Sequence, residues 1–142
     1  MNRSRKTEMA YMKYRIENRG KDCVFCEFND ANASQVIRTT SHFWIVKNIF
    51  PYKTWDMLPV KHHLMIVPKR HVDSLSHFTA PEMKEYTELL VEYDTAGYSA
   101  YGRASGNIAK SIAHQHTHLL KLGTRPRRVG FYLLKPYINL QR

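Results

Sequence analysis

Several features that define other classes of protein are missing from this 142-residue chain. It has no run of about 18 apolar residues, so we expect no membrane-spanning helix and no membrane partner. No apolar stretch of the signal-peptide type follows the polar first residues, and we expect an intracellular, cytoplasmic protein. Repeats and low-complexity segments are also missing. With 43% hydrophobic and 12% aromatic residues, the chain can form one domain with a sizeable core.

Acidic residues are scarce at both ends of the chain. Residues 1–21 carry a net charge of +5, residues 121–142 carry +6 without any acid, and residues 22–120 carry −1. We therefore divide the chain into a basic N-terminal arm or helix, residues 1–21, and a single domain, residues 22–142, with a basic tail. Basic ends can bind polyphosphates, nucleic acid or acidic membranes, or they can simply add solubilising charge.

Cysteine is scarce too, because Cys23 and Cys26 are the only two. Two cysteines separated by two residues are typical of a metal knuckle or of a redox pair. A metal site would need two further ligands, and the chain has eight histidines that could supply them. Two buried thiols without a metal are the alternative.

The remaining pattern predicts an α+β domain with a mainly antiparallel sheet. Strand-type composition predicts a hairpin from residues 35–40 and 42–47 and an apolar strand over residues 63–68. A Thr-Ala-Pro-Glu start and apolar residues at helical spacing predict the main helix over residues 79–101. We also expect a loop at residues 53–61 and strands at residues 103–108, 114–122 and 130–134.

Three histidines alternate with other residues in the segment His114-Gln-His116-Thr-His118-Leu-Leu. In a β-strand, side chains point to opposite faces with a period of two, so the three imidazoles would share one face. Such a face favours a phosphate site, a metal site or nucleophilic catalysis over a polar strand with solvated histidines.

This segment resembles the signature of the histidine-triad (HIT) superfamily of nucleotide hydrolases and transferases. Three other segments resemble that family in the same order: Cys23-Val-Phe-Cys26, Asn48-Ile-Phe-Pro-Tyr52 and His63-Leu-Met-Ile-Val-Pro-Lys-Arg-His71. The resemblance implies a five-stranded antiparallel sheet with one long helix and, here, a short N-terminal helix. It also implies a homodimer joined into one continuous sheet, with one nucleotide site in each subunit.

The same resemblance implies an enzyme that attacks the α-phosphorus of nucleoside 5′-phosphoryl compounds. His116 would be the nucleophile and form a nucleotidyl-histidine that water hydrolyses to a nucleoside monophosphate. His118 would donate to the phosphate oxygens or protonate the leaving group, and a histidine at this position favours hydrolysis over transfer. A dinucleoside polyphosphate phosphorylase is the second interpretation, and a non-catalytic nucleotide- or RNA-binding module is the third.

Substrate contacts follow from the resemblance as well. Ser111 would contact phosphate, and Asn48 would bind the ribose hydroxyls, with Asn107 as a second candidate that could equally be a turn residue. Lys110 stands where many hydrolases of the family have glutamine; it could bind an extended polyphosphate or an anionic leaving group, or be a solvated loop lysine. A base pocket could involve four apolar residues, of which we expect at least two to be ordinary core: Phe43, Ile45, Phe50 and Ile66.

Finally, the resemblance implies a structural Zn²⁺ bound by Cys23, Cys26, His71 and His114. Zinc in structural sites prefers four tetrahedral nitrogen and sulfur ligands, and this set fills all four positions. His114 would therefore have a role distinct from that of His116. We interpret the remaining histidines as surface or structural residues: His42, His62, His63 and His77.

Overall fold

The computed structural model describes residues 3–20, 22–28 and 34–125. The helices in these ranges are α1 (Arg5–Glu17), the short 3-10 helix η1 (Leu75–His77) and α2 (Ala80–Thr95). The strands are β1 (Val36–Thr39), β2 (Phe43–Lys47), β3 (Thr54–Trp55), β4 (Leu58–Pro68), β5 (Ser99–Gly102) and β6 (Thr117–Leu122). No helix within the described ranges combines the length and the apolar character needed to cross a bilayer.

Five strands form an antiparallel sheet in the order β1-β2-β4-β6-β5, and the short β3 pairs with the start of β4. This confirms the predicted α+β class, the five-stranded antiparallel sheet and the hairpin formed by β1 and β2. The apolar run at residues 63–68 forms the second half of β4, which pairs with β2 along one edge and with β6 along the other. The histidine-bearing strand β6 therefore lies inside the sheet.

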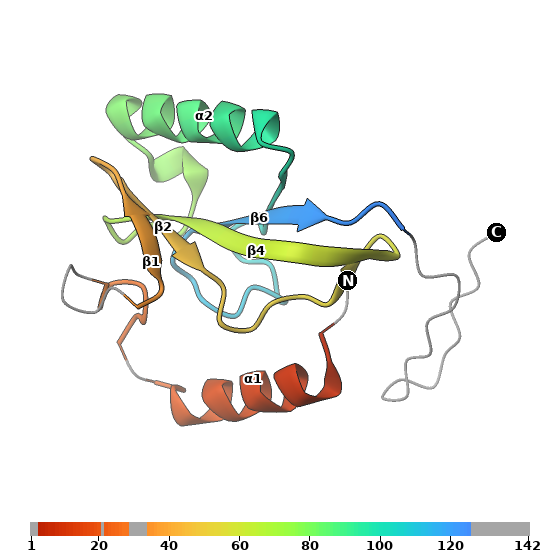
Figure 1. Ribbon diagram of the computed structural model, residues 1–142. Coiled ribbons are helices and arrows are strands. Elements are labelled where there is room, and N and C mark those ends of the chain that lie inside the picture. The colour runs from red at the N-terminus through yellow and green to blue at the C-terminus, as the bar shows by residue number, and fades with distance from the viewer. Residues whose placement is uncertain (1–2, 21, 29–33, 126–142) are drawn as a thin grey trace.

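The two faces of the sheet meet different helices, with α2 on one side and α1 on the other (Figure 1). The α2 side holds the core cluster of Phe43, Ile45, Ile66, Tyr86, Leu89 and Leu119. A second cluster consists of Phe25, Trp44, Val46, Met65 and Val67. Met65 lies directly opposite His118 in the pairing of β4 with β6. Because residues opposite each other share a face, the His118 side chain is on the face away from α2.

Helix α2 starts as predicted but ends earlier. The Thr79 side chain accepts from the backbone N–H of Glu82, and the Glu82 side chain accepts from the backbone N–H of Thr79, which completes a capping box. The expectation of a helix over residues 79–101 is wrong at its C-terminal end, because Gly97 (φ +80°) takes the chain out of the helix. The next strand is β5, so the strand expected at residues 103–108 is also wrong.

Two further boundaries differ from the prediction. The loop expected at residues 53–61 contains β3 and the start of β4, joined by Asp56 and Met57, both with positive φ. Strand β6 begins at Thr117, three residues later than expected, because the backbone N–H of Gln115 donates to the Val72 carbonyl at 2.6 Å. The strand expected at residues 130–134 lies outside the described residues.

Candidate active site and metal centre

The chain enters β6 through a bend that carries His114, a fully buried side chain. Its Nε2–H donates to the carbonyl oxygen of Pro68 at 2.9 Å, which places the ring proton on Nε2. The unprotonated Nδ1 therefore faces Sγ of Cys23 at 3.4 Å and Sγ of Cys26 at 3.6 Å. Burial lowers the pKa of His114 to about 4, so the ring is neutral at pH 7, as a metal ligand must be.

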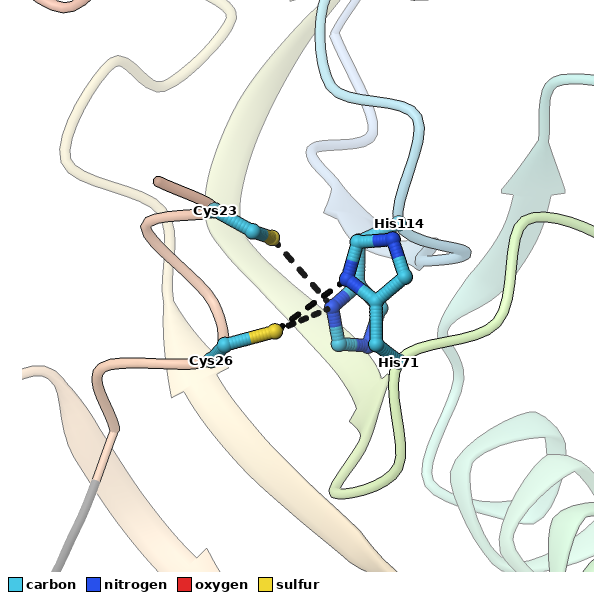
Figure 2. A group of neighbouring side chains, drawn as sticks. All are labelled: Cys23, Cys26, His71 and His114. Atoms are coloured by element: carbon cyan, nitrogen blue, oxygen red, sulfur yellow. Dashed lines mark hydrogen bonds between the residues drawn. The ribbon is translucent and has the colours of Figure 1, made fainter. Parts of the chain in front are cut away.

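Four predicted metal ligands converge from three separate parts of the chain: Cys23, Cys26, His71 and His114 (Figure 2). Their ligand atoms all lie within 4.8 Å of one another, and Sγ of Cys26 is 3.1 Å from Nδ1 of His71. Zinc bonds of about 2.0–2.3 Å in a tetrahedron place ligand atoms about 3.3–3.8 Å apart. The donor set and its spacing therefore suit a zinc ion whose coordination is filled by protein.

The thiols of the knuckle also favour a metal over a redox role. Burial, together with the Cys23 thiol and the carboxylates of Asp22 and Glu27, raises the pKa of Cys26 to about 11. A reactive redox cysteine needs a lowered thiol pKa, whereas a cation can displace the thiol protons as it binds. Between the metal knuckle and the redox pair, the environment of Cys26 therefore favours the metal knuckle.

His116 follows with a different orientation and a different proton position. Its Nδ1–H donates to the carbonyl oxygen of His114 at 2.8 Å, and the side chain is 7% exposed. The lone pair is therefore on Nε2. His116 lines a cavity of about 910 Å³ on the side of the sheet that faces α1. Burial lowers the pKa of His116, so the imidazole is neutral and can act as a nucleophile at pH 7.

His118 is oriented by His63, which we interpreted from the sequence as a surface or structural residue. The backbone N–H of Tyr52 donates to Nδ1 of His63 at 3.1 Å, so a neutral His63 carries its proton on Nε2. That Nε2–H faces Nδ1 of His118 at 2.9 Å and the amide nitrogen of Asn48 at 3.1 Å. An amide nitrogen cannot accept, so the proton is donated to His118, which leaves the His118 proton on its own Nε2. Burial lowers the pKa of His63 to about 3 and that of His118 to about 2, so both rings are neutral.

The sequence indicated part of the role of His63, namely the face of the strand on which it lies. A histidine at the start of an apolar strand, two residues before Met65, lies on the same face as that methionine. Since Met65 is opposite His118 in the sheet, His63 lies diagonally across from His118. The register between β4 and β6 was the information that the sequence did not contain.

Two of the predicted substrate-binding residues line the cavity with His116 and His118. These are Asn48 and Ser111. Asn48 is 8% exposed, and its Oδ1 accepts from the backbone N–H of Phe50 at 2.8 Å, so it also fixes the end of β2. Of the four candidates for the base pocket, Phe50 lines the cavity, whereas Phe43, Ile45 and Ile66 belong to the core beside α2.

The other two predicted contacts lie elsewhere in the described loop. Lys110 Nζ donates to the carbonyl oxygen of Asp73 and to Oε1 of Gln115, both at 2.8 Å, and it is not among the residues that line the cavity. Its charge still lowers the pKa values of His114 and His116 after the larger effect of burial. Asn107 accepts from the backbone N–H of Ala109 at 2.9 Å, which is the turn role left open above.

Solved structures, but not sequences, of known proteins are similar to this chain. No protein-family model matches the sequence, and no curated protein matches it. Among solved structures, a HIT family hydrolase from Legionella pneumophila is 19% identical, with a TM-score of 0.53 over 73% of this chain and 94% of that one. A histidine triad protein from Clostridium difficile is 21% identical, with a TM-score of 0.53 over 77% and 96% of the two chains.

A zinc-bound histidine triad family protein from Mycobacterium smegmatis is also similar. It is 18% identical, with a TM-score of 0.52, and the alignment covers 77% of each chain. These likenesses show that the present chain has the histidine-triad fold. The α+β fold that the family resemblance implied is therefore confirmed.

Proposed function

We propose that this chain is a member of the HIT superfamily and a hydrolase of nucleoside 5′-phosphoryl compounds. The proposed substrates are dinucleoside polyphosphates, nucleoside phosphoramidates and adenylates. The observation that supports the proposal is the pair of proton positions on His116 and His118. The carbonyl of His114 holds the proton of His116 on Nδ1 and leaves Nε2 as a nucleophile, while His63 leaves His118 with a donor on Nε2.

In the proposed reaction, Nε2 of His116 attacks the α-phosphorus, and an N–P bond forms as the bond to the leaving group breaks. The leaving group departs with the electron pair of that bond, and the Nε2–H of His118 donates to an oxygen of the reacting phosphate. Water then attacks the same phosphorus, the N–P bond returns its electron pair to His116, and a nucleoside monophosphate is released. One proton of the water stays on the new P–OH group, and the other goes to solvent and replaces the proton that the leaving group took from solvent in the first step.

We further propose that Cys23, Cys26, His71 and His114 bind a structural Zn²⁺. When bound, the ion supplies a cross-link between the N-terminal knuckle and the entrance of β6, and no step of the reaction passes through it. The converging ligand atoms and the proton position of His114 support this assignment. Elemental analysis of the purified protein should find about one zinc per chain, and Cys26→Ser should reduce that content.

We also infer a homodimer joined into one continuous sheet, in which α2 is part of the interface. Met83 and Val91 are 38% and 62% exposed on the outer side of this helix, where the described residues offer them no partner element. Light scattering coupled to gel filtration should give twice the mass of the chain. A monomer at micromolar concentration would contradict this inference without affecting the chemistry proposed above.

The first experiment is incubation with diadenosine tetraphosphate and with adenosine 5′-phosphoramidate, with and without inorganic phosphate. His116→Asn removes the nucleophile, and His77→Asn is the matched control because His77 is exposed and outside the cavity. We expect AMP to form without phosphate and to be lost only in His116→Asn. ADP that forms only with phosphate would instead assign phosphorolysis. No turnover of either compound would favour the nucleotide- or RNA-binding alternative.

A further inference from the structure

Helix α1 has an unusual distribution of side chains. Three aliphatic residues point to solvent, since Met9, Met12 and Ile16 are 61%, 57% and 74% exposed. The aromatic residues Tyr11 and Tyr14 point the other way and line the cavity that contains the triad. No residue of α1 is fully buried, although the helix lies against the histidine-bearing face of the sheet (Figure 1). The inner side of α1 therefore meets a cavity instead of a packed core.

The aromatic side chains of α1 are held in place by the end of β2 and by Arg3. The rings of Tyr11 and Tyr14 have their centroids 5.5 and 5.2 Å from that of Phe50. Arg3 donates through Nε to the Phe50 carbonyl at 3.0 Å, and its guanidinium lies 4.0 Å from the centroid of the Tyr11 ring. The same guanidinium lies 4.9 Å from the ring centroid of Tyr52, which connects α1 to the loop beside His63.

A second aromatic group lines the same cavity from the knuckle. The rings of Phe25 and Phe28 stack with centroids 5.6 Å apart and an angle of 30° between their planes. Phe25 also contacts the nucleophile candidate, because its centroid is 5.2 Å from that of His116. Within the described residues no ring contact joins this pair to the group formed by Tyr11, Tyr14 and Phe50, although both groups line one cavity.

We propose that α1 is one wall of a stacking site for the base of the substrate, with Tyr11, Tyr14 and Phe50 on one side and Phe25 and Phe28 on the other. The ligand is a nucleotide with a flat purine base, and the inference rests on the proposed function because it concerns the same site. A cavity of about 910 Å³ is near the upper end of the range of ~300–1,000 Å³ for small-molecule sites. It therefore has room for a base in addition to the reacting phosphate.

The chemistry of the two walls selects a ring system. Stacking on an aromatic side chain is favourable for any base and is worth ~1–3 kcal/mol per base, which corresponds to roughly 5- to 150-fold in affinity. Purines offer the larger stacking area, so they should bind more tightly than pyrimidines in such a site. Arg3 is a positioning residue here, because it orients Tyr11 and ties α1 to the triad side of the cavity through Tyr52.

The test compares two ligands that differ only in the base, AMP and ribose 5-phosphate, by isothermal titration calorimetry on the full chain. We expect the wild-type protein to bind AMP at least about tenfold more tightly than ribose 5-phosphate. Tyr11→Ala and Tyr14→Ala should each reduce this ratio severalfold, and the double variant should bring it close to one. Met9→Ala and Met12→Ala are the matched controls on the solvent side of α1, and they should keep the wild-type ratio.

Each outcome decides the proposal. A ratio that is unchanged in the double variant, or an equal loss of affinity for both ligands, would overturn it, because α1 would then not contact the base. A circular dichroism melt shows whether the tyrosine variants keep the fold, and Tyr11→Phe with Tyr14→Phe should preserve the ratio because both rings remain. Failure of this inference is separate from failure of the proposed function, since turnover of adenosine 5′-phosphoramidate is measured independently.

Discussion

Replacing His63 tests whether the chemistry of His118 depends on the partner that fixes its proton. In His63→Leu, the buried N–H of Tyr52 and the buried Nδ1 of His118 would both lose their partner, and the Asn48 amide would lose its contact with the ring. An unsatisfied buried polar group costs about 1–3 kcal/mol, so we expect the free energy of unfolding to fall by about 2–4 kcal/mol. We also expect kcat for adenosine 5′-phosphoramidate to fall by about 10²-fold, because the His118 ring no longer keeps its donor on Nε2.

A matched variant separates the proton position from general destabilisation. In His63→Gln, the side-chain amide can still donate to Nδ1 of His118, although the ring is gone. Both variants should be assayed at saturating substrate and at a temperature below their melting transitions, with kcat and KM determined separately. We expect glutamine to recover at least about tenfold of the lost kcat. Equal kcat values for the glutamine and leucine variants, or wild-type kcat in His63→Leu, would refute the reasoning.

Three further predictions concern stability. Hydrogen bonds from Arg70, together with the capping bonds, lower the pKa of Glu82 to about 2, below its value in the unfolded chain. The ionised Glu82 therefore adds to the free energy of unfolding above about pH 5, and this stabilisation is lost as the pH falls toward 2. Glu82→Gln should therefore cost about 1–2 kcal/mol at pH 7, since the half-exposed Arg70 is partly screened, and urea titrations from pH 2 to 7 should show a flatter profile. Cys26→Ser, or a chelator acting on the wild type, should lower Tm by about 5 °C or more, and zinc should restore only the chelated wild type. Gly123→Ala would place Cβ 2.8 Å from the Pro59 ring and should destabilise the fold by about 1–3 kcal/mol, measurable by urea unfolding; wild-type stability would show that the ring can move aside.

The parts of the fold that could be predicted from the sequence are those that depend on local pattern. The β1–β2 hairpin and the start of α2 follow from strand composition and from a capping box, both of which are local. The end of α2 was predicted too late because apolar spacing continues past Gly97, whereas the positive φ of that glycine ends the helix. A glycine after the last helical turn was the available signal.

The parts that could not be predicted depend on contacts between distant segments. Cys23 and Cys26 suggested a metal site, but the two histidine partners came from the family resemblance, since nothing local relates residues 91 positions apart. Lys110 is predicted either to bind an extended polyphosphate or an anionic leaving group, or to be a solvated loop lysine, and in the structure its Nζ donates to the carbonyl of Asp73 and to Oε1 of Gln115. A loop lysine can find such a partner only once the loop at residues 103–113 has its path, which no periodicity specifies.

The alternating histidines illustrate how one simple pattern produces three different groups. All three rings are buried and neutral, so their chemistry is decided by the hydrogen bond that fixes the position of the proton on each ring. The Pro68 carbonyl leaves His114 with a free Nδ1 beside the two thiols, and the His114 carbonyl leaves His116 with a free Nε2 in the cavity. At His118 the sense of the contact is reversed, because His63 donates to Nδ1 and leaves His118 with a donor on Nε2. Two acceptors and one donor thus leave three identical residues with different free atoms, which is the basis on which we propose a metal ligand, a nucleophile and a hydrogen-bond donor.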